Sequence, residues 1–243
     1  MLGPPFLPSL RPNAILPRPL SLAHARHPPV KPTHRTLIFV IALAAVALFI
    51  AAARLDPLPG DETLAIQIQQ IEFPGMLPLM QGITILGDGV LLAGVGLAFA
   101  VYWWATHFRA AAYAAAATLL IMPTGWLLKL FVDRPRPTAD ALIRITSDFS
   151  GLGFPSGHAF QSTLVIGLLI GVAALRMRPG RLRLATMGLL ALLIVAIGFS
   201  RIYLGAHWPS DVLGGYLAAT PIVLVIHARL SSAVGPIPAP PVS

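Results

Sequence analysis

The stretch LATMGLLALLIVAIGFSRIYLGAHWPSD, residues 184–211, joins a long apolar run to a short polar cluster. The run contains no charged side chain before Arg201. A transmembrane helix needs about 20 consecutive, mostly apolar residues, so the pattern predicts a membrane-spanning helix over Leu184–Tyr203. The cluster after it, which includes His207 and Asp211, would then lie at one edge of the bilayer, where ionisable side chains usually have a function.

Apolar runs of similar length occur along the rest of the chain. The six expected spans are Thr36–Ala53, Gly89–Ala105, Ala110–Leu130, Ala159–Leu175, Leu184–Tyr203 and Val212–Leu230. Of the 243 residues, 56% are hydrophobic and only 11% are charged, whereas soluble domains have about 45–50% apolar and about 25% charged residues. The composition therefore excludes a soluble globular domain and predicts an all-α, polytopic membrane helix bundle with six transmembrane helices. Pro123 and Gly125 predict a kink in the third span.

The segments outside these spans are short. Residues 54–88 contain acidic side chains at a plausible helix start, Asp61 and Glu62. They predict one or two short interfacial helices between the first and second spans, the second over Met76–Leu86. Residues 1–35 are rich in Pro and Arg and contain no acid, which predicts a disordered cytoplasmic tail. The expected six-span domain covers residues 36–230, and residues 231–243 form a short Pro-rich C-terminal tail.

The distribution of basic residues indicates the orientation. The N-terminal tail has five Lys or Arg and the 176–183 turn has four Arg, whereas residues 54–88 have one Arg and five acids. The positive-inside rule places both termini in the cytoplasm and the connections 54–88, 131–158 and 204–211 outside. Because the chain has no cysteine and no N-glycosylation motif, we expect a multi-pass protein of a bacterial inner (plasma) membrane, with its active site on the periplasmic or extracellular face.

The net charge of +8 raises the question of nucleic-acid binding. The basic residues stand in short loops between apolar runs, where membrane orientation accounts for them, so no nucleic-acid partner is expected. The lipid bilayer is the expected partner. The sequence leaves the oligomeric state open.

Three polar clusters interrupt the apolar pattern: residues 129–137 (KLFVDRPRP), residues 155–158 (PSGH) and residues 200–211 (SRIYLGAHWPSD). All three stand at the outward ends of predicted spans, so the topology alone brings them together. Their chemistry suits a phosphate group. Lys129, Arg136 and Arg201 supply cations that bind phosphate oxygens.

The second cluster adds a helix N-terminus. Ser156 and Gly157 directly precede the fourth span, and free N–H groups with the helix dipole favour an anion there. His158 and His207 can serve as acid and nucleophile near neutral pH. Asp211 stands four residues after His207, so its carboxylate can hold the imidazole tautomer. Cations outnumber acids around these histidines, so no metal and no cofactor are expected.

Together the clusters closely resemble the signature of the type 2 phosphatidic acid phosphatase superfamily, membrane lipid phosphatases related to vanadium haloperoxidases. The family pattern is Lys, six residues, Arg-Pro; then Pro-Ser-Gly-His; then Ser-Arg, five residues, His, three residues, Asp. The matching positions are Lys129, Arg136, Pro137, Pro155, Ser156, Gly157, His158, Ser200, Arg201, His207 and Asp211. The resemblance covers about residues 36–230 and suggests a bacterial undecaprenyl-diphosphatase-like or phosphatidylglycerophosphatase-like member.

The resemblance implies a role for each matched site residue. His207 is the implied nucleophile and Asp211 its orienting partner, while His158 protonates the leaving lipid oxygen and then activates water. The implied phosphate cradle consists of Lys129, Arg136, Ser156, Gly157 and Arg201. The family is metal-independent. Arg134 and Arg144 share the outer loop, where they are candidates for contact with the lipid head group.

The expected function is therefore hydrolysis of a lipid phosphate or diphosphate at the outer face through a phosphohistidine intermediate, with undecaprenyl diphosphate as the favoured substrate. Phosphatidylglycerophosphate, phosphatidic acid and lipid A phosphates are alternative substrates. A vanadium haloperoxidase is a second reading, but those relatives are soluble and much longer. A non-catalytic lipid transporter of the same fold is an alternative of another class, although transporters usually place charges near mid-membrane and not at one edge.

Overall fold

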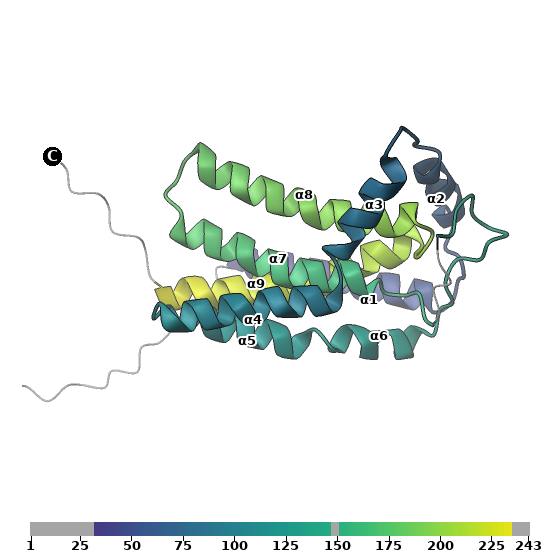
Figure 1. Ribbon diagram of the computed structural model, residues 1–243. Helices are drawn as coiled ribbons and strands as arrows, with labels where there is room; N and C mark the ends of the chain where they lie inside the picture. The colour runs from purple at the N-terminus through teal and green to yellow at the C-terminus, as the bar shows by residue number, and fades with distance from the viewer. Residues whose placement is uncertain (1–31, 147–150, 235–243) are drawn as a thin grey trace, which may run out of the picture.

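The computed structural model describes residues 32–146 and 151–234, and every regular element in these ranges is a helix (Figure 1). The helices are α1 (Pro32–Ala52), α2 (Asp61–Gln69), α3 (Met76–Ile85), α4 (Gly89–Ala105), α5 (Arg109–Ile121), α6 (Thr124–Val132), α7 (Gly157–Arg176), α8 (Arg181–Tyr203) and α9 (Pro209–Val234). The predicted all-α fold class is confirmed. The predicted tails lie outside the described residues, apart from their inner ends, which extend α1 and α9.

The spans agree with the apolar runs. α4 has the predicted bounds Gly89–Ala105, and α1 begins at Pro32 instead of Thr36, since proline is well suited to the first turn of a helix. Within the described ranges, five helices are long and apolar enough to cross a membrane, with α5 and α6 counted as one, and a sixth results if the bent pair α3–α4 forms one span.

The third span breaks where the sequence predicts a kink. α5 ends at Ile121 and α6 begins at Thr124, so Met122 and Pro123 separate the two helices. Proline removes one backbone hydrogen bond and its ring clashes with the preceding turn. The break lets α6 continue as a separate helix that carries Lys129 to the end of the bundle.

Two short helices, α2 and α3, connect the first and second spans, as predicted. The Asp88 carboxylate caps α4 by accepting hydrogen bonds from the backbone N–H groups of Val90 and Leu91, at 2.9 and 3.1 Å. The axes of α3 and α4 differ by 50° at this junction. The bend directs α3 over the end of α8, against which it packs.

α7 is the central helix of the bundle. It packs against α8 and α9 and also contacts α4, α5 and α6. Its Phe160 and Leu164 are fully buried, in one apolar cluster with Ile197 of α8 and Val223 of α9. Leu189 on the outer face of α8 is 67% exposed, as expected where a helix faces lipid.

The two ends of the bundle differ in charge. The α4–α5 and α7–α8 turns lie at one end, on the left in Figure 1, together with the Arg-rich residues 176–183. The α2 helix and the loop after α6 lie at the opposite end. All three polar clusters belong to this second end, because they follow α6, precede α7 and join α8 to α9.

Candidate active site

Backbone and side-chain hydrogen bonds join the three clusters directly. Lys129 donates from Nζ to the carbonyl oxygens of Leu152 and Gly153, at 2.7 and 3.4 Å, so the end of α6 is tied to the loop before α7. The Ser156 N–H donates to the Asp211 carbonyl oxygen at 2.9 Å, which ties the start of α7 to the start of α9. The structure therefore brings all three clusters together.

His207 lies at the centre of this arrangement and is 2% exposed. Its Nδ1 is 3.3 Å from Oδ2 of Asp211, and its Nε2 is 3.2 Å from Nη1 of Arg136. A guanidinium only donates hydrogen bonds and an ionised carboxylate only accepts them. The proton must therefore reside on Nδ1, which leaves the lone pair of Nε2 directed toward Arg136.

A second hydrogen bond to the same carboxylate oxygen of Asp211 helps to hold this orientation. Oδ2 also accepts a hydrogen bond from the Trp208 N–H at 3.0 Å. Asp211 is in the first turn of α9, which begins at Pro209. Asp211 is fully buried, so its carboxylate is held at the start of a helix and faces His207, which lies in the short connection between α8 and α9.

The cations approach the same place from different elements. Arg136 also donates to the Ala206 carbonyl oxygen at 2.8 Å, so the loop after α6 is held against the α8–α9 connection. Arg201 is near the end of α8 and donates from Nη1 to Oγ1 of Thr84 at 2.8 Å. The contact brings α3 into the site, and Thr84 is a residue for which the sequence carried no signal.

The α7 N-terminus completes the candidate cradle. Ser156 is the N-cap residue of α7, but its side chain makes no capping hydrogen bond. Its Oγ is buried and has no hydrogen-bond partner among the residues that the structure describes. A buried hydroxyl without a partner is costly, whereas next to a helix N-terminus and three cations it would bind an anionic oxygen well.

The electrostatics of His207 agree with this geometry. Burial lowers the pKa of His207 well below its usual value, and the positive charges of Arg136, Lys129 and Arg201 lower it further. His207 is therefore neutral at neutral pH. Burial also lowers the pKa of Arg136, although the Asp211 charge opposes this effect.

His158, the predicted acid, occupies the first turn of α7 and is half-buried. It lies close enough to His207 to influence that residue's pKa. Its ring is also close to Gly87, where a Cβ atom would lie 3.0 Å from Cδ2 of His158. The α3–α4 junction therefore forms the wall of the site beside His158.

Arg134 does not point to the head-group region. It is 1% exposed and pairs with three carboxylates, those of Asp56, Asp61 and Asp211, at 3.0, 2.8 and 2.9 Å. Burial alone would lower its pKa, but the hydrogen bonds with Asp61 and Asp56 and the charges of Asp211 and Asp61 raise it. Arg144 pairs instead with Glu72, so both loop arginines are held by acids.

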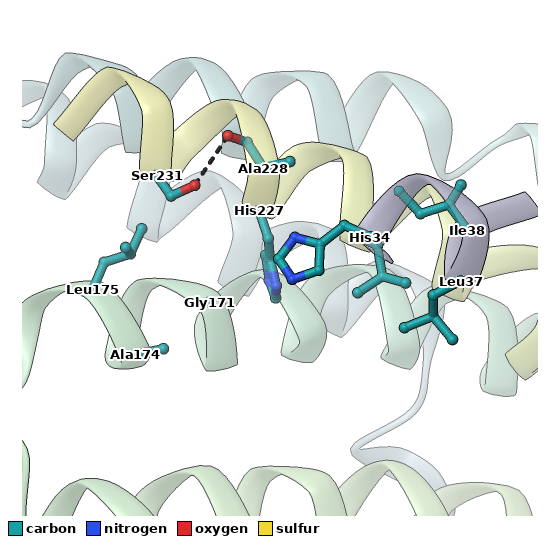
Figure 2. Close-up of a pocket in the computed structure, with 10 residues that line it drawn as sticks. His34, Leu37, Ile38, Gly171, Ala174, Leu175, His227, Ala228 and Ser231 are labelled. Carbon is teal, nitrogen blue, oxygen red and sulfur yellow. Dashed lines mark hydrogen bonds between the residues drawn. The ribbon is translucent and has the colours of Figure 1, made fainter. Parts of the chain in front are cut away.

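A separate pocket of about 270 Å³ opens at the other end of the bundle (Figure 2). Its lining comes from α1, α7 and α9 and includes His34, Gly171 and His227, but no signature residue. Gly171 lies about 20 Å along α7 from Gly157 at a rise of about 1.5 Å per residue. The pocket is therefore distinct from the candidate active site.

Comparison with known proteins identifies the family. The model of the PAP2 superfamily matches residues 108–232, a range that contains all three clusters. The chain belongs to the PAP2 superfamily. Members of the PAP2 family are lipid phosphate phosphatases, so the predicted enzyme class is confirmed.

Individual relatives of the PAP2 superfamily support the assignment. Phosphatidylglycerophosphatase B of Bacillus subtilis is 28% identical over 200 residues, which are 76% of this chain and 88% of that protein. Decaprenylphosphoryl-5-phosphoribose phosphatase of Mycobacterium tuberculosis is 32% identical over 165 residues, 65% of this chain and 82% of that one.

A solved structure supports the fold. The transmembrane PAP2-type phosphatidylglycerolphosphate phosphatase from Bacillus subtilis superposes with a TM-score of 0.59 and 21% identity, over 80% of this chain and 92% of that chain. The protein is thus a multi-pass PAP2 membrane phosphatase with a polytopic helical fold.

Proposed function

We propose that this PAP2 phosphatase hydrolyses a lipid phosphate or diphosphate at the outer face of a bacterial inner membrane through a phosphohistidine on His207, without a metal ion. One observation carries the proposal. Nδ1 of His207 faces the Asp211 carboxylate while Nε2 faces Arg136, which fixes the tautomer with the unprotonated Nε2 among three cations. A neutral imidazole in this environment is suited to attack an anionic phosphorus centre.

In the first step Nε2 of His207 attacks phosphorus, and the bond between phosphorus and the leaving oxygen breaks. His158 gives its proton to that oxygen, which belongs to the lipid alcohol of a monoester or to the lipid monophosphate of a diphosphate. Asp211 stabilises the Nδ1–H of the phosphorylated imidazole. Lys129, Arg136 and Arg201 neutralise the charge that spreads over the equatorial oxygens.

In the second step a water molecule attacks the phosphorus of the phosphohistidine. His158, now unprotonated, takes a proton from the water, and the bond between phosphorus and Nε2 breaks. Inorganic phosphate leaves, and His207 returns to its neutral tautomer. The same two histidines therefore serve in both steps, and each proton taken by His158 is the one it later gives to a new leaving group.

The geometry supports a metal-independent reaction. Three cationic side chains already surround the nucleophile, and they supply the positive charge that a divalent cation supplies in other phosphoryl-transfer enzymes. A divalent cation would be repelled by the same charges. Vanadate, as a phosphate mimic that binds His207, is expected to inhibit.

The lipid is the finer part of the proposal. The favoured substrate is undecaprenyl diphosphate, with phosphatidylglycerophosphate, phosphatidic acid and lipid A phosphates as alternatives. The Mycobacterium relative is named as a phosphatase of a polyprenyl lipid, which supports a prenyl tail in the substrate. The Bacillus relative is named as a phosphatase of a glycerolipid, which supports phosphatidylglycerophosphate as an alternative. The motif residues would bind the phosphate and not the tail, so a substrate panel decides between these lipids.

The test is phosphate release by the purified, detergent-solubilised protein in the presence of EDTA, with these four lipids as substrates. We expect release that EDTA does not reduce and that His207→Ala abolishes, because the mutant lacks the nucleophile. Acid-labile, base-stable phosphate on the wild-type protein identifies the phosphohistidine.

Three results would count against the proposal. Activity that EDTA removes contradicts the metal-free mechanism. Undiminished activity of His207→Ala contradicts the nucleophile. The absence of phosphate release from all four lipids contradicts this substrate class. If the protein is instead a lipid transporter, lipid transport is expected to persist in His207→Ala.

A further inference from the structure

Arg134 is the most completely buried cation near the candidate site, yet it belongs to none of the signature positions. All three nitrogens of its guanidinium donate hydrogen bonds. Nε donates to Asp56 at 3.0 Å, Nη2 donates to Asp61 at 2.8 Å, and Nη1 donates to both Ser210 Oγ and Asp211 Oδ1 at 2.7 and 2.9 Å. The side chain thus joins the segment between α1 and α2 to the first turn of α9.

Asp61, the first residue of α2, closes the network from the other side. Its Oδ1 accepts a hydrogen bond from the Ser210 N–H at 2.9 Å, and its Oδ2 accepts from the Ser210 hydroxyl at 2.6 Å. Oδ2 also accepts from the Leu58 N–H at 3.0 Å. Asp61 is 5% exposed, Ser210 is 8% exposed and Asp211 is 0% exposed, so water competes little for these bonds.

The network divides the two oxygens of Asp211 between different partners. Oδ1 binds Arg134, whereas Oδ2 binds the Trp208 N–H and faces Nδ1 of His207. A carboxylate can rotate about its Cβ–Cγ bond. With Oδ1 held by a guanidinium that is itself held by Asp61, the rotation is blocked and Oδ2 stays directed at His207.

We propose that Arg134 and Asp61 are positioning residues of the phosphatase, which hold the Asp211 carboxylate and thereby the His207 imidazole in the orientation for attack. The inference rests on the proposed function, since it assigns a partner to the same nucleophile. Neither side chain needs to contact the substrate for this effect. The outer segment that carries Asp56 and Asp61 becomes part of the catalytic apparatus, because its docking against α9 completes the support of Asp211.

Asp61→Asn tests the proposal with little change in shape. All groups facing the Asp61 oxygens are donors, namely Arg134, the Leu58 N–H and the two groups of Ser210. An amide must turn its own NH₂ toward one of them, so at least one bond is lost. The matched control is Glu62→Gln, which removes the next acid of the same helix turn from an exposed position.

The readout separates positioning from folding. Orthovanadate binding by calorimetry counts the intact phosphate sites, and kcat is then expressed per vanadate-binding site. For Asp61→Asn we expect about one site per chain, an almost unchanged KM for the best lipid of the panel, and a kcat per site about 10- to 100-fold lower, as for a slightly misplaced catalytic group. Glu62→Gln is expected to keep the wild-type kcat.

Ser210→Ala provides a second, milder variant should Asp61→Asn fail to fold. It removes the hydroxyl that links Arg134 to Asp61, and Ser231→Ala on the distant part of α9 is its control. We expect a several-fold lower kcat per site for Ser210→Ala only. Its kcat is measured at several substrate concentrations so that a change in KM is separated from a change in turnover.

The outcomes distinguish the two levels of the argument. If the wild-type protein is active and Asp61→Asn or Ser210→Ala turns over as fast per site as its control, the positioning role is wrong, even when thermal stability falls. If the wild-type protein releases no phosphate from any lipid, the proposed function fails and the inference fails with it. A selective loss of kcat in the network variants supports the inference.

Discussion

The contact between Arg136 and Nε2 of His207, at 3.2 Å, gives one side chain two effects. Its charge helps to lower the pKa of His207, after burial, which has the larger effect, and its N–H groups are candidates for binding phosphate oxygens. A protonated imidazole cannot attack phosphorus. Because the lowered pKa keeps His207 neutral into the acidic range, the acid limb of kcat/KM is expected to lie below the usual histidine range.

Arg136→Gln and Arg136→Lys separate these effects. Both variants lose the bidentate grip on phosphate, so kcat/KM is expected to fall about 10²- to 10³-fold in each. Only Arg136→Gln removes the positive charge, which raises the pKa of His207 and moves the acid limb to higher pH. The measurement is kcat/KM against pH with one lipid substrate for all three proteins. An acid limb that stays in place in Arg136→Gln, or moves equally in both variants, contradicts this electrostatic account.

The residues of the site differ in how far the sequence reveals them. Lys129, Arg136, His158 and Arg201 come from all three motifs and lie close enough to His207 to affect its pKa. The buried contacts of Arg134, Asp61 and Thr84 were not predicted. In the sequence, Asp61 looks like an ordinary acid in the first turn of a helix. In the structure it binds Ser210, which is 149 residues away. Local patterns do not identify such partners, because the packing of distant segments decides which side chain an acid meets.

At the scale of helices, the contact between α7 and α9 sets the position of the site. A Cβ atom on Gly215 of α9 would lie 2.7 Å from the Ser156 carbonyl oxygen and 2.8 Å from Cβ of Ala159. The two helices approach this closely where Ser156 donates to Asp211. The close approach keeps the α7 N-terminus beside the nucleophile, and backbone atoms cannot rotate aside as a side chain can.

Gly215→Ala should therefore separate the two helices. We expect a lower temperature of half-inactivation in detergent and a lower kcat, since overpacking typically costs about 1–3 kcal/mol. Gly188→Ala in α8 is the control, because no heavy atom lies within 4 Å of its Cβ position and alanine favours a helix by about 1 kcal/mol. For both variants, residual phosphatase activity after a series of heating steps gives the temperature of half-inactivation, and the activity before heating gives kcat. Equal heat resistance of Gly215→Ala and the wild type would show that the helices tolerate the methyl group.

The helices themselves were largely predictable. Apolar length located the spans, and Pro123 located the break between α5 and α6. The bend of 50° between α3 and α4 was not predictable, since the sequence around Gly87 indicates only that one helix ends and another begins. The angle depends on what α3 packs against, which is the end of α8. The bend brings Thr84 to Arg201 and Gly87 to His158.

At the scale of the whole molecule, the basic turn that indicates the orientation and the candidate active site lie at opposite ends of the bundle. The Arg-rich turn between α7 and α8 is at one end, and the candidate active site is at the other. The positive-inside rule therefore predicts that the site lies on the outer face. In that orientation the site would meet only lipids of the outer leaflet, because a phosphorylated head group crosses the bilayer slowly without help.

The absence of cysteine from all 243 residues makes the orientation directly testable. Ala139→Cys introduces a thiol in the exposed loop after α6, and Pro179→Cys introduces one in the exposed α7–α8 turn. In intact bacterial spheroplasts, a membrane-impermeant maleimide is expected to label the first variant and not the second, and to label both after the membrane is opened. Both substitutions leave the charged residues unchanged, so the orientation signal is not altered. Labelling of Pro179→Cys alone in intact spheroplasts would place the site in the cytoplasm, and the substrate would then have to come from the inner leaflet.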